Sequence, residues 1–205
     1  MLRSERWPLK EVELQGSLAH TTRAEIEGAL AGRVGGNFFD ARLGDVRSAL
    51  EGLPWVRSVG VRRVWPDKLE VEIEEHVALA RWGDGGLVNT YGERFPGKSE
   101  EKLPLFVGPR GAEGQVTRGY ALLTQSVAPL GARPDQVVLT ARFAWQLRLD
   151  NGVHLMLGRD LEAARDRLER FVAVAAASQG RMTTRFEYVD LRYPNGFALR
   201  VPVKG

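Results

Sequence analysis

The chain has 205 residues, of which 43% are hydrophobic and 27% charged, a balance typical of a soluble globular protein and not of a disordered or fibrous one. Its 29 basic and 26 acidic residues give a formal net charge of +3 and are interleaved along the sequence, which argues against a nucleic-acid-binding surface. The sequence holds no cysteine, so disulfides, thiol nucleophiles and cysteine-ligated zinc are excluded, and its length suits one large domain or two small ones.

No run of about 18 apolar residues occurs, so the sequence contains no candidate transmembrane helix, and its first residues do not resemble a signal peptide. Two interpretations stay open. The protein is either soluble and cytoplasmic, or the sequence is the soluble part of a protein whose membrane anchor lies outside it. The absence of cysteine does not decide the compartment.

The first half of the chain begins with a predicted strand and two predicted helices. Alternating apolar residues indicate a strand within residues 10–18. Thr22 and Glu25 have the spacing of a capping box, which predicts the start of a helix. Asp40 is expected to cap a second, amphipathic helix that ends before Pro54.

Two alternating strands follow, joined by a turn at residues 66–67, so the predicted order is β-α-α-β-β. We expect both helices to cover one face of a three-stranded sheet. The residues expected in the core are apolar and share the inward positions of these elements: Leu43, Val46, Leu50, Val59, Val61, Val71 and Ile73.

The second half predicts a mixed sheet with at least two helices, separated from the first half by the glycine-rich residues 82–86. The expected elements are a hairpin at 87–95, a strand within 103–109, a helix at 117–128, a hairpin at 145–157, a long helix from Asp160 and a closing hairpin at 184–202.

The closing hairpin poses a question about its last strand. Pro194, Asn195 and Gly196 form the predicted turn, and residues 197–202 form the strand that follows it. With no further chain to cover it, this strand would leave free N–H and C=O groups on the edge of the sheet. Such an edge has to be covered by other parts of the protein, prevented from pairing by its own side chains, or used for binding.

No catalytic, metal or cofactor site is expected. The three histidines, His20, His76 and His154, lie far apart and share no spacing with carboxylates. Glu70, Glu72, Glu74 and Glu75 look like a carboxylate cluster, but at a period of two the first three line the solvated face of a strand. A hydrolase using these carboxylates is a rival interpretation.

Several segments together resemble one protein family. Residues 53–82, "LPWVRSVGVRRVWPDKLEVEIEEHVALARW", resemble the polypeptide-transport-associated (POTRA) domain of the bacterial FtsQ/DivIB family. Residues 141–159, "ARFAWQLRLDNGVHLMLGR", and 188–202, "YVDLRYPNGFALRVP", resemble its second domain. The resemblance runs from about Leu9 to Val201. His76 and Val77 stand where many members carry a proline.

The resemblance implies an α+β fold, with a POTRA domain (β-α-α-β-β) at residues 9–82 and a mixed, mainly antiparallel β-sheet domain with two or more helices at 83–202. It also implies a non-catalytic scaffold of the division complex without a cofactor, which binds FtsB and through it FtsL. Such a protein is anchored in the inner membrane by one helix, with its bulk in the periplasm, and its longer native N-terminus would contain about 20 apolar residues. A POTRA-type assembly module of outer-membrane biogenesis is the alternative, for which tandem POTRA repeats and a barrel would be expected.

The resemblance also implies a partner site at the C-terminal edge. Arg159 and Arg192 match family positions that contact FtsB, and residues 197–202 would accept a strand of FtsB by β-augmentation. Without the resemblance, both arginines could simply decorate a sheet, and the aromatic residues beside the turn could belong to the core. Val201 stands near a position where family members often carry tryptophan, which should weaken that end of the contact. The expected site residues are Arg159, Arg192, Tyr193, Asn195, Gly196, Phe197, Leu199 and Val201.

Overall fold

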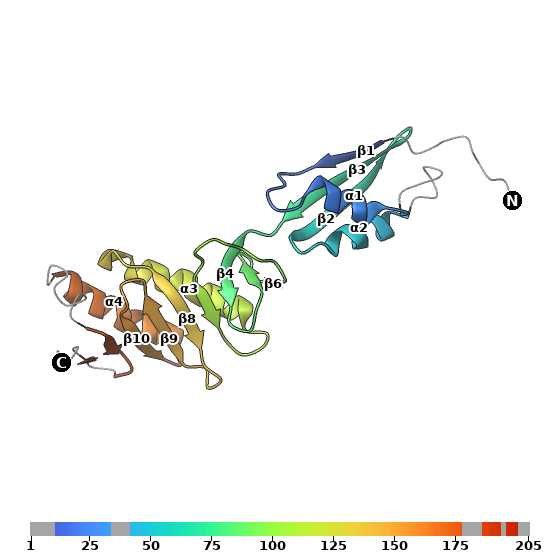
Figure 1. The fold of residues 1–205 in the computed structure, drawn as a ribbon. Coiled ribbons are helices and arrows are strands. Elements are labelled where there is room, and N and C mark those ends of the chain that lie inside the picture. The colour runs from blue at the N-terminus through green and yellow to red at the C-terminus, as the bar shows by residue number, and fades with distance from the viewer. Residues whose placement is uncertain (1–10, 34–41, 178–185, 194–195, 201–205) are drawn as a thin grey trace. The chain divides into compact units, whose positions relative to one another are not determined.

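The structure, a computed structural model, describes residues 11–33, 42–177, 186–193 and 196–200 and divides the chain into two compact units, residues 1–77 and 78–205. The first unit contains β1 (Glu11–Gln15), α1 (Arg23–Leu30), α2 (Leu43–Glu51), β2 (Val56–Val64) and β3 (Lys68–Glu75) (Figure 1). The second contains β4 (Ala78–Trp82), β5 (Leu87–Asn89), β6 (Arg94–Phe95), β7 (Leu105–Val107), α3 (Glu113–Val127), a 3₁₀ turn η1 (Ala128–Leu130), β8 (Pro134–Leu139), β9 (Trp145–Leu149), β10 (His154–Gly158), α4 (Leu161–Ala177), β11 (Tyr188–Asp190) and β12 (Ala198–Arg200).

The first unit has the predicted β-α-α-β-β order. Its sheet has the strand order β1-β3-β2, in which β1 pairs parallel and β2 antiparallel with β3. Figure 1 shows both helices on one face of this sheet. The capping box that begins α1 is present, because Glu25 N–H donates to the Thr22 hydroxyl and Thr22 N–H donates to the Glu25 carboxylate.

The core of the first unit follows the predicted register with one exception. It consists of Ile26, Val46, Leu50, Val56, Val59, Val71 and Ile73, with Val61 packed against it. The prediction for Leu43 is wrong: it is half-buried and lies outside this cluster, because the apolar stripe of α2 reaches the core only from Val46 onward. The residue at the N-cap of α2 is Arg42, which makes no side-chain cap, and Asp40 lies outside the described residues.

The side chain of Glu75, the last residue of β3, holds the loop that precedes α1. One carboxylate oxygen accepts hydrogen bonds from Ala19 N–H (2.8 Å) and His20 N–H, and the other accepts one from Thr21 N–H (2.6 Å). Burial raises the pKa of Glu75, but hydrogen bonds from Thr21, Ala19 and His20 outweigh it, so the pKa lies below its ordinary value of 4.5. The His20 ring also stacks on Trp55, with ring centroids 3.6 Å apart.

The second unit is built on one sheet with the strand order β12-β11-β10-β9-β8-β7-β4-β5-β6. The described pairs β10–β11, β7–β8 and β4–β7 are parallel, and the other neighbours are antiparallel. Helices α3 and α4 pack on each other, α3 on β8 and α4 on β10 (Figure 1). Together with the first unit, this confirms the α+β fold predicted from the sequence.

Three details of the second unit differ from the expectation. Strand β8 was not predicted. Helix α3 begins at Glu113, four residues before the expected Thr117. The prediction placed the domain boundary after Trp82, whereas β4 pairs with β5 and β7 and so belongs to the second sheet. Within the ranges that the structure describes, no helix has the length and apolar character needed to cross a membrane.

We predict that Glu75→Gln lowers the free energy of unfolding of the first unit by about 1 kcal/mol at pH 7, because the amide nitrogen cannot accept the loop N–H groups and solvent screens part of the effect. Since the pKa of Glu75 is lowered in the folded state, its contribution is complete above its ordinary pKa of 4.5 and is lost as the pH falls through the folded value. The difference between the two proteins should therefore shrink below pH 4.5. Urea unfolding at several pH values measures it.

Glu72→Gln is the matched control, since Glu72 lies on the same strand but is exposed, and no described residue hydrogen-bonds its side chain. It should leave the free energy of unfolding within about 0.5 kcal/mol. Equal effects of the two substitutions would show that the contacts of Glu75 with the loop do not stabilise the unit.

Candidate functional site

Strand β12 forms one edge of the nine-stranded sheet. It pairs antiparallel with β11, with Ala198 opposite Asp190 and Arg200 opposite Tyr188. Among the described strands none pairs with its other side. A shallow groove of ≈ 450 Å³ lies along this strand and is lined by Tyr188, Ala198, Leu199 and Arg200. The main chain of β12 is therefore positioned to accept a further strand.

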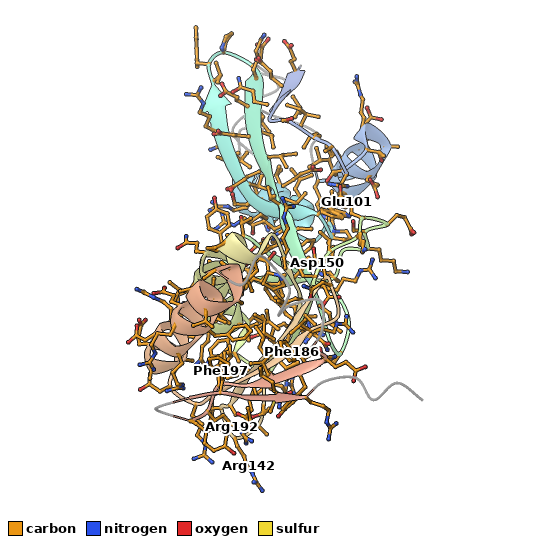
Figure 2. All side chains as sticks on the ribbon, turned by 90° about the vertical axis from the view of Figure 1, so that its left-hand side faces the viewer. Glu101, Arg142, Asp150, Phe186, Arg192 and Phe197 are labelled. Carbon is orange, nitrogen blue, oxygen red and sulfur yellow. The ribbon has the colours of Figure 1, made fainter. Side chains whose placement is uncertain are left out.

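The inward side chains of this segment hold the edge strand on the core. The rings of Phe197 and Phe171 meet edge to face, with centroids 5.3 Å apart, and Leu199 packs against the same cluster. Figure 2 shows Phe197 close to helix α4. Phe197 and Leu199 are half-buried, so they stabilise the strand and offer a partner less surface than a fully exposed residue would.

Arg192 is engaged with a carboxylate of its own chain. Its Nε donates to Asp190 Oδ1 (2.8 Å) and its Nη2 to Oδ2 (2.5 Å), while its backbone N–H donates to Oδ1 (3.0 Å). Hydrogen bonds from the Arg192 side chain lower the pKa of Asp190, although burial acts in the opposite direction. The pairing also raises the pKa of Arg192. Asp190 is buried and Arg192 half-exposed, so the guanidinium is held in place and still presents one side to solvent.

Arg159 and Arg192 come together in an open groove of ≈ 490 Å³ at the end of strands β8 to β10. Gly158 directs Arg159 there: it has φ +89° and lies where the pairing of β10 with β9 shifts in register, so the chain leaves the strand in a conformation that favours glycine. Arg192 reaches the groove because β11 pairs in parallel with β10, with Asp190 opposite Met156. Arg167 of α4 fixes this end of β10 by donating to the Leu157 carbonyl (2.8 Å).

The same groove contains a residue that the sequence analysis did not single out. Arg142, in the turn between β8 and β9, lines it together with Arg159 and Arg192. Figure 2 shows Arg142 and Arg192 next to each other at one end of the second unit. Asp190 was also missed. Its only signal in the sequence is its position in the alternating segment that precedes Arg192.

Of the remaining expected site residues, two are exposed and two lie outside the described residues. Tyr193 is 55% exposed and directly follows Arg192, before the residues predicted to form the closing turn. Gly196 is exposed. Asn195 and Val201 lie outside the described residues. The structure thus brings Arg159, Arg192 and Tyr193 to one end of the sheet next to the edge strand.

The carboxylates considered for hydrolysis make structural contacts. Arg62 donates to Glu70 (2.5 Å), Arg57 and Ser58 donate to Glu74, and Glu75 holds the loop before α1. Within residues 11–33, 42–177, 186–193 and 196–200, no group of three histidine, aspartate or glutamate side chains is arranged to hold a metal ion.

We predict that Arg192→Ala lowers the midpoint of urea unfolding at pH 7, because it leaves the buried Asp190 carboxylate with the backbone N–H of residue 192 but without its guanidinium partner. The double variant Asp190→Asn, Arg192→Ala should regain part of the loss, since an amide carries no charge. Because the pKa of Asp190 is lowered in the folded state, the deficit should fade as the pH falls below 3.8, its ordinary value. A double variant no more stable than Arg192→Ala would contradict this account.

Comparisons with known proteins match both units. The family model described as POTRA domain, FtsQ-type, matches residues 7–76, and the one described as cell division protein FtsQ/DivIB, C-terminal, matches residues 80–192. A relative from Nitrosospira multiformis is 44% identical over 198 residues, covering 94% of this chain and 83% of the relative. One from Burkholderia pseudomallei is 40% identical over 197 residues (94% and 79%), and one from Escherichia coli is 35% identical over 205 residues (96% and 74%).

All three relatives are named cell division protein FtsQ, a name that describes a role in cell division and not an enzymatic activity. The order of the two matches along the chain is also the order of the two units in the structure. The resemblance found in the sequence is thereby confirmed, and the chain belongs to the FtsQ/DivIB family of cell division proteins.

Proposed function

We propose that this protein is a non-catalytic scaffold of the division complex that binds FtsB by strand addition to β12, and through FtsB binds FtsL. The observation that carries the proposal is the position of β12 at the end of the nine-stranded sheet, with no described strand on its outer side. An extended segment laid beside it would gain a ladder of main-chain hydrogen bonds, because the donors and acceptors of an edge strand are already aligned.

Main-chain pairing alone is not specific, so side chains next to the edge must select the partner. Tyr193 is an exposed aromatic residue directly after Arg192, and tyrosine is among the residue types that most often anchor interfaces. Arg159 and Arg192 supply positive charge within the adjacent groove, which favours acidic residues on the partner. In this proposal Phe197 and Leu199 contribute indirectly, because they pack against the core and keep β12 in place.

The proposed cellular setting follows from the family. The protein works at the division site, with its bulk in the periplasm and one helix in the inner membrane. There it links early and late division proteins. The POTRA unit offers a separate surface for other members of the complex. The match of residues 7–76 to an FtsQ-type POTRA domain supports this assignment over a module of outer-membrane biogenesis.

We predict that Tyr193→Ala weakens binding of the periplasmic part of FtsB at least tenfold, which corresponds to about 1.4 kcal/mol. The melting temperature should stay nearly unchanged, because the side chain is exposed. Tyr91→Ala is the matched control, since Tyr91 is a similarly exposed tyrosine of the same unit that lies outside the proposed site. Isothermal titration calorimetry measures both affinities.

Two results would overturn the proposal. One is wild-type affinity in the Tyr193→Ala variant. The other is a complex in which NMR or hydrogen exchange shows no added protection of the β12 amides when FtsB is bound, because strand addition must protect the outward N–H groups of that edge.

A further inference from the structure

We propose that the turn between β8 and β9, through Arg142 and Phe143, forms a second part of the partner interface and receives an acidic segment of the partner. This inference rests on the proposed function, because the groove that it concerns adjoins the proposed edge-strand site. It adds two residues that neither the sequence analysis nor the family resemblance indicated.

The charges of the groove are unbalanced. Arg142, Arg159 and Arg192 all line it, and no lining residue among those described carries a carboxylate. Arg192 is engaged with Asp190, whereas within the described residues neither Arg142 nor Arg159 makes a hydrogen bond or ion pair. Arg142 and Arg159, which line one open groove without a carboxylate, favour a carboxylate of the partner, which guanidinium binds through two parallel hydrogen bonds.

Phe143 adds an independent observation. It is 53% exposed and has φ +58°, the left-handed conformation that is uncommon for a bulky side chain. The turn holds it there: Phe143 N–H donates to the Thr140 carbonyl (2.8 Å), Thr140 N–H to the Ala144 carbonyl (2.9 Å) and Ala144 N–H to the Thr140 hydroxyl (3.0 Å). Glycine would adopt this conformation without strain, so the turn keeps a large apolar side chain exposed at a position that favours glycine, and this side chain is the apolar part of the proposed contact.

The register of the sheet sets how far the partner must extend. Ala198 of β12 lies opposite Asp190, Asp190 opposite Met156, and Met156 opposite Gln146 of β9, and the last two line the groove. With neighbouring strands about 4.8 Å apart, β9 lies roughly 14 Å from the edge strand. A strand added to β12 does not reach the β8–β9 turn by itself. The partner therefore needs a second, acidic segment that crosses the open face of the sheet.

The test compares charge reversal inside and outside the groove, with the periplasmic part of FtsB from the same organism as the probe. Arg142→Glu should weaken binding at least tenfold, and raising the salt concentration should weaken binding of this variant less than that of the wild type. Arg118→Glu changes the net charge equally but lies on the exposed side of α3, in the layer that covers the other face. It should change the affinity less than twofold.

The variant Phe143→Gly tests whether the Phe143 side chain contacts the partner or only stabilises the turn. It removes the ring and relieves the strained conformation, so the melting temperature should stay equal or rise while binding weakens at least threefold. If Arg142→Glu and Arg118→Glu bind equally well, the acidic-segment proposal is wrong, and wild-type binding by Phe143→Gly removes Phe143 from the interface. If the wild-type protein itself does not bind FtsB, it is the proposed function that fails.

Discussion

Helices α3 and α4 cover only one face of the sheet in the second unit, and this one-sided packing determines how its strands are arranged. Trp145, Leu147 and Leu149 of β9, like Leu155 and Leu157 of β10, are almost fully buried beneath these helices. A shift of either strand by one residue would expose this whole set, so the register is strongly fixed. Helix α3 comes so close that a side chain at Gly119 would approach the Trp145 ring to 2.4 Å. The same alternation directs Gln146 and Met156 to the uncovered face, so the packing of the core determines what the groove contains.

Local patterns were enough to predict most elements of this fold. The capping box of α1 and the hairpin of β9 and β10 each depend on residues close together in the sequence, and both are present. Strand β8 was missed because its buried residues, Pro134, Val137 and Leu139, do not alternate strictly, since the pairing with β9 shifts near Pro134. The first turn of α3 was missed because its N-cap, Ala112, has no side chain that could signal a helix start.

The candidate site was less predictable, because it depends on contacts between distant residues. Arg159 and Arg192 share a groove only because β10 and β11 pair in parallel and Gly158 redirects the chain at the end of β10. Tyr193 and Phe197 flank the same predicted turn, and the sequence could not tell which of them faces solvent. The structure separates them, since Phe197 meets Phe171 in the core and Tyr193 is exposed. The salt bridge of Arg192 with Asp190 is local, but its importance comes from the burial of Asp190, which no pattern in the sequence reveals.

The edge position of β12 affects the solubility of this protein when it is present in excess over its partner. An unpaired edge strand accepts any extended segment of suitable register, including the same strand of a second copy. Molecules made in excess over their partner would therefore have a route to edge-to-edge association, which the proposed strand addition would close. The exposed charge of Arg200 on β12 limits this association. Under the proposed function, balanced synthesis of the protein and its partner would then contribute to solubility as well as to assembly.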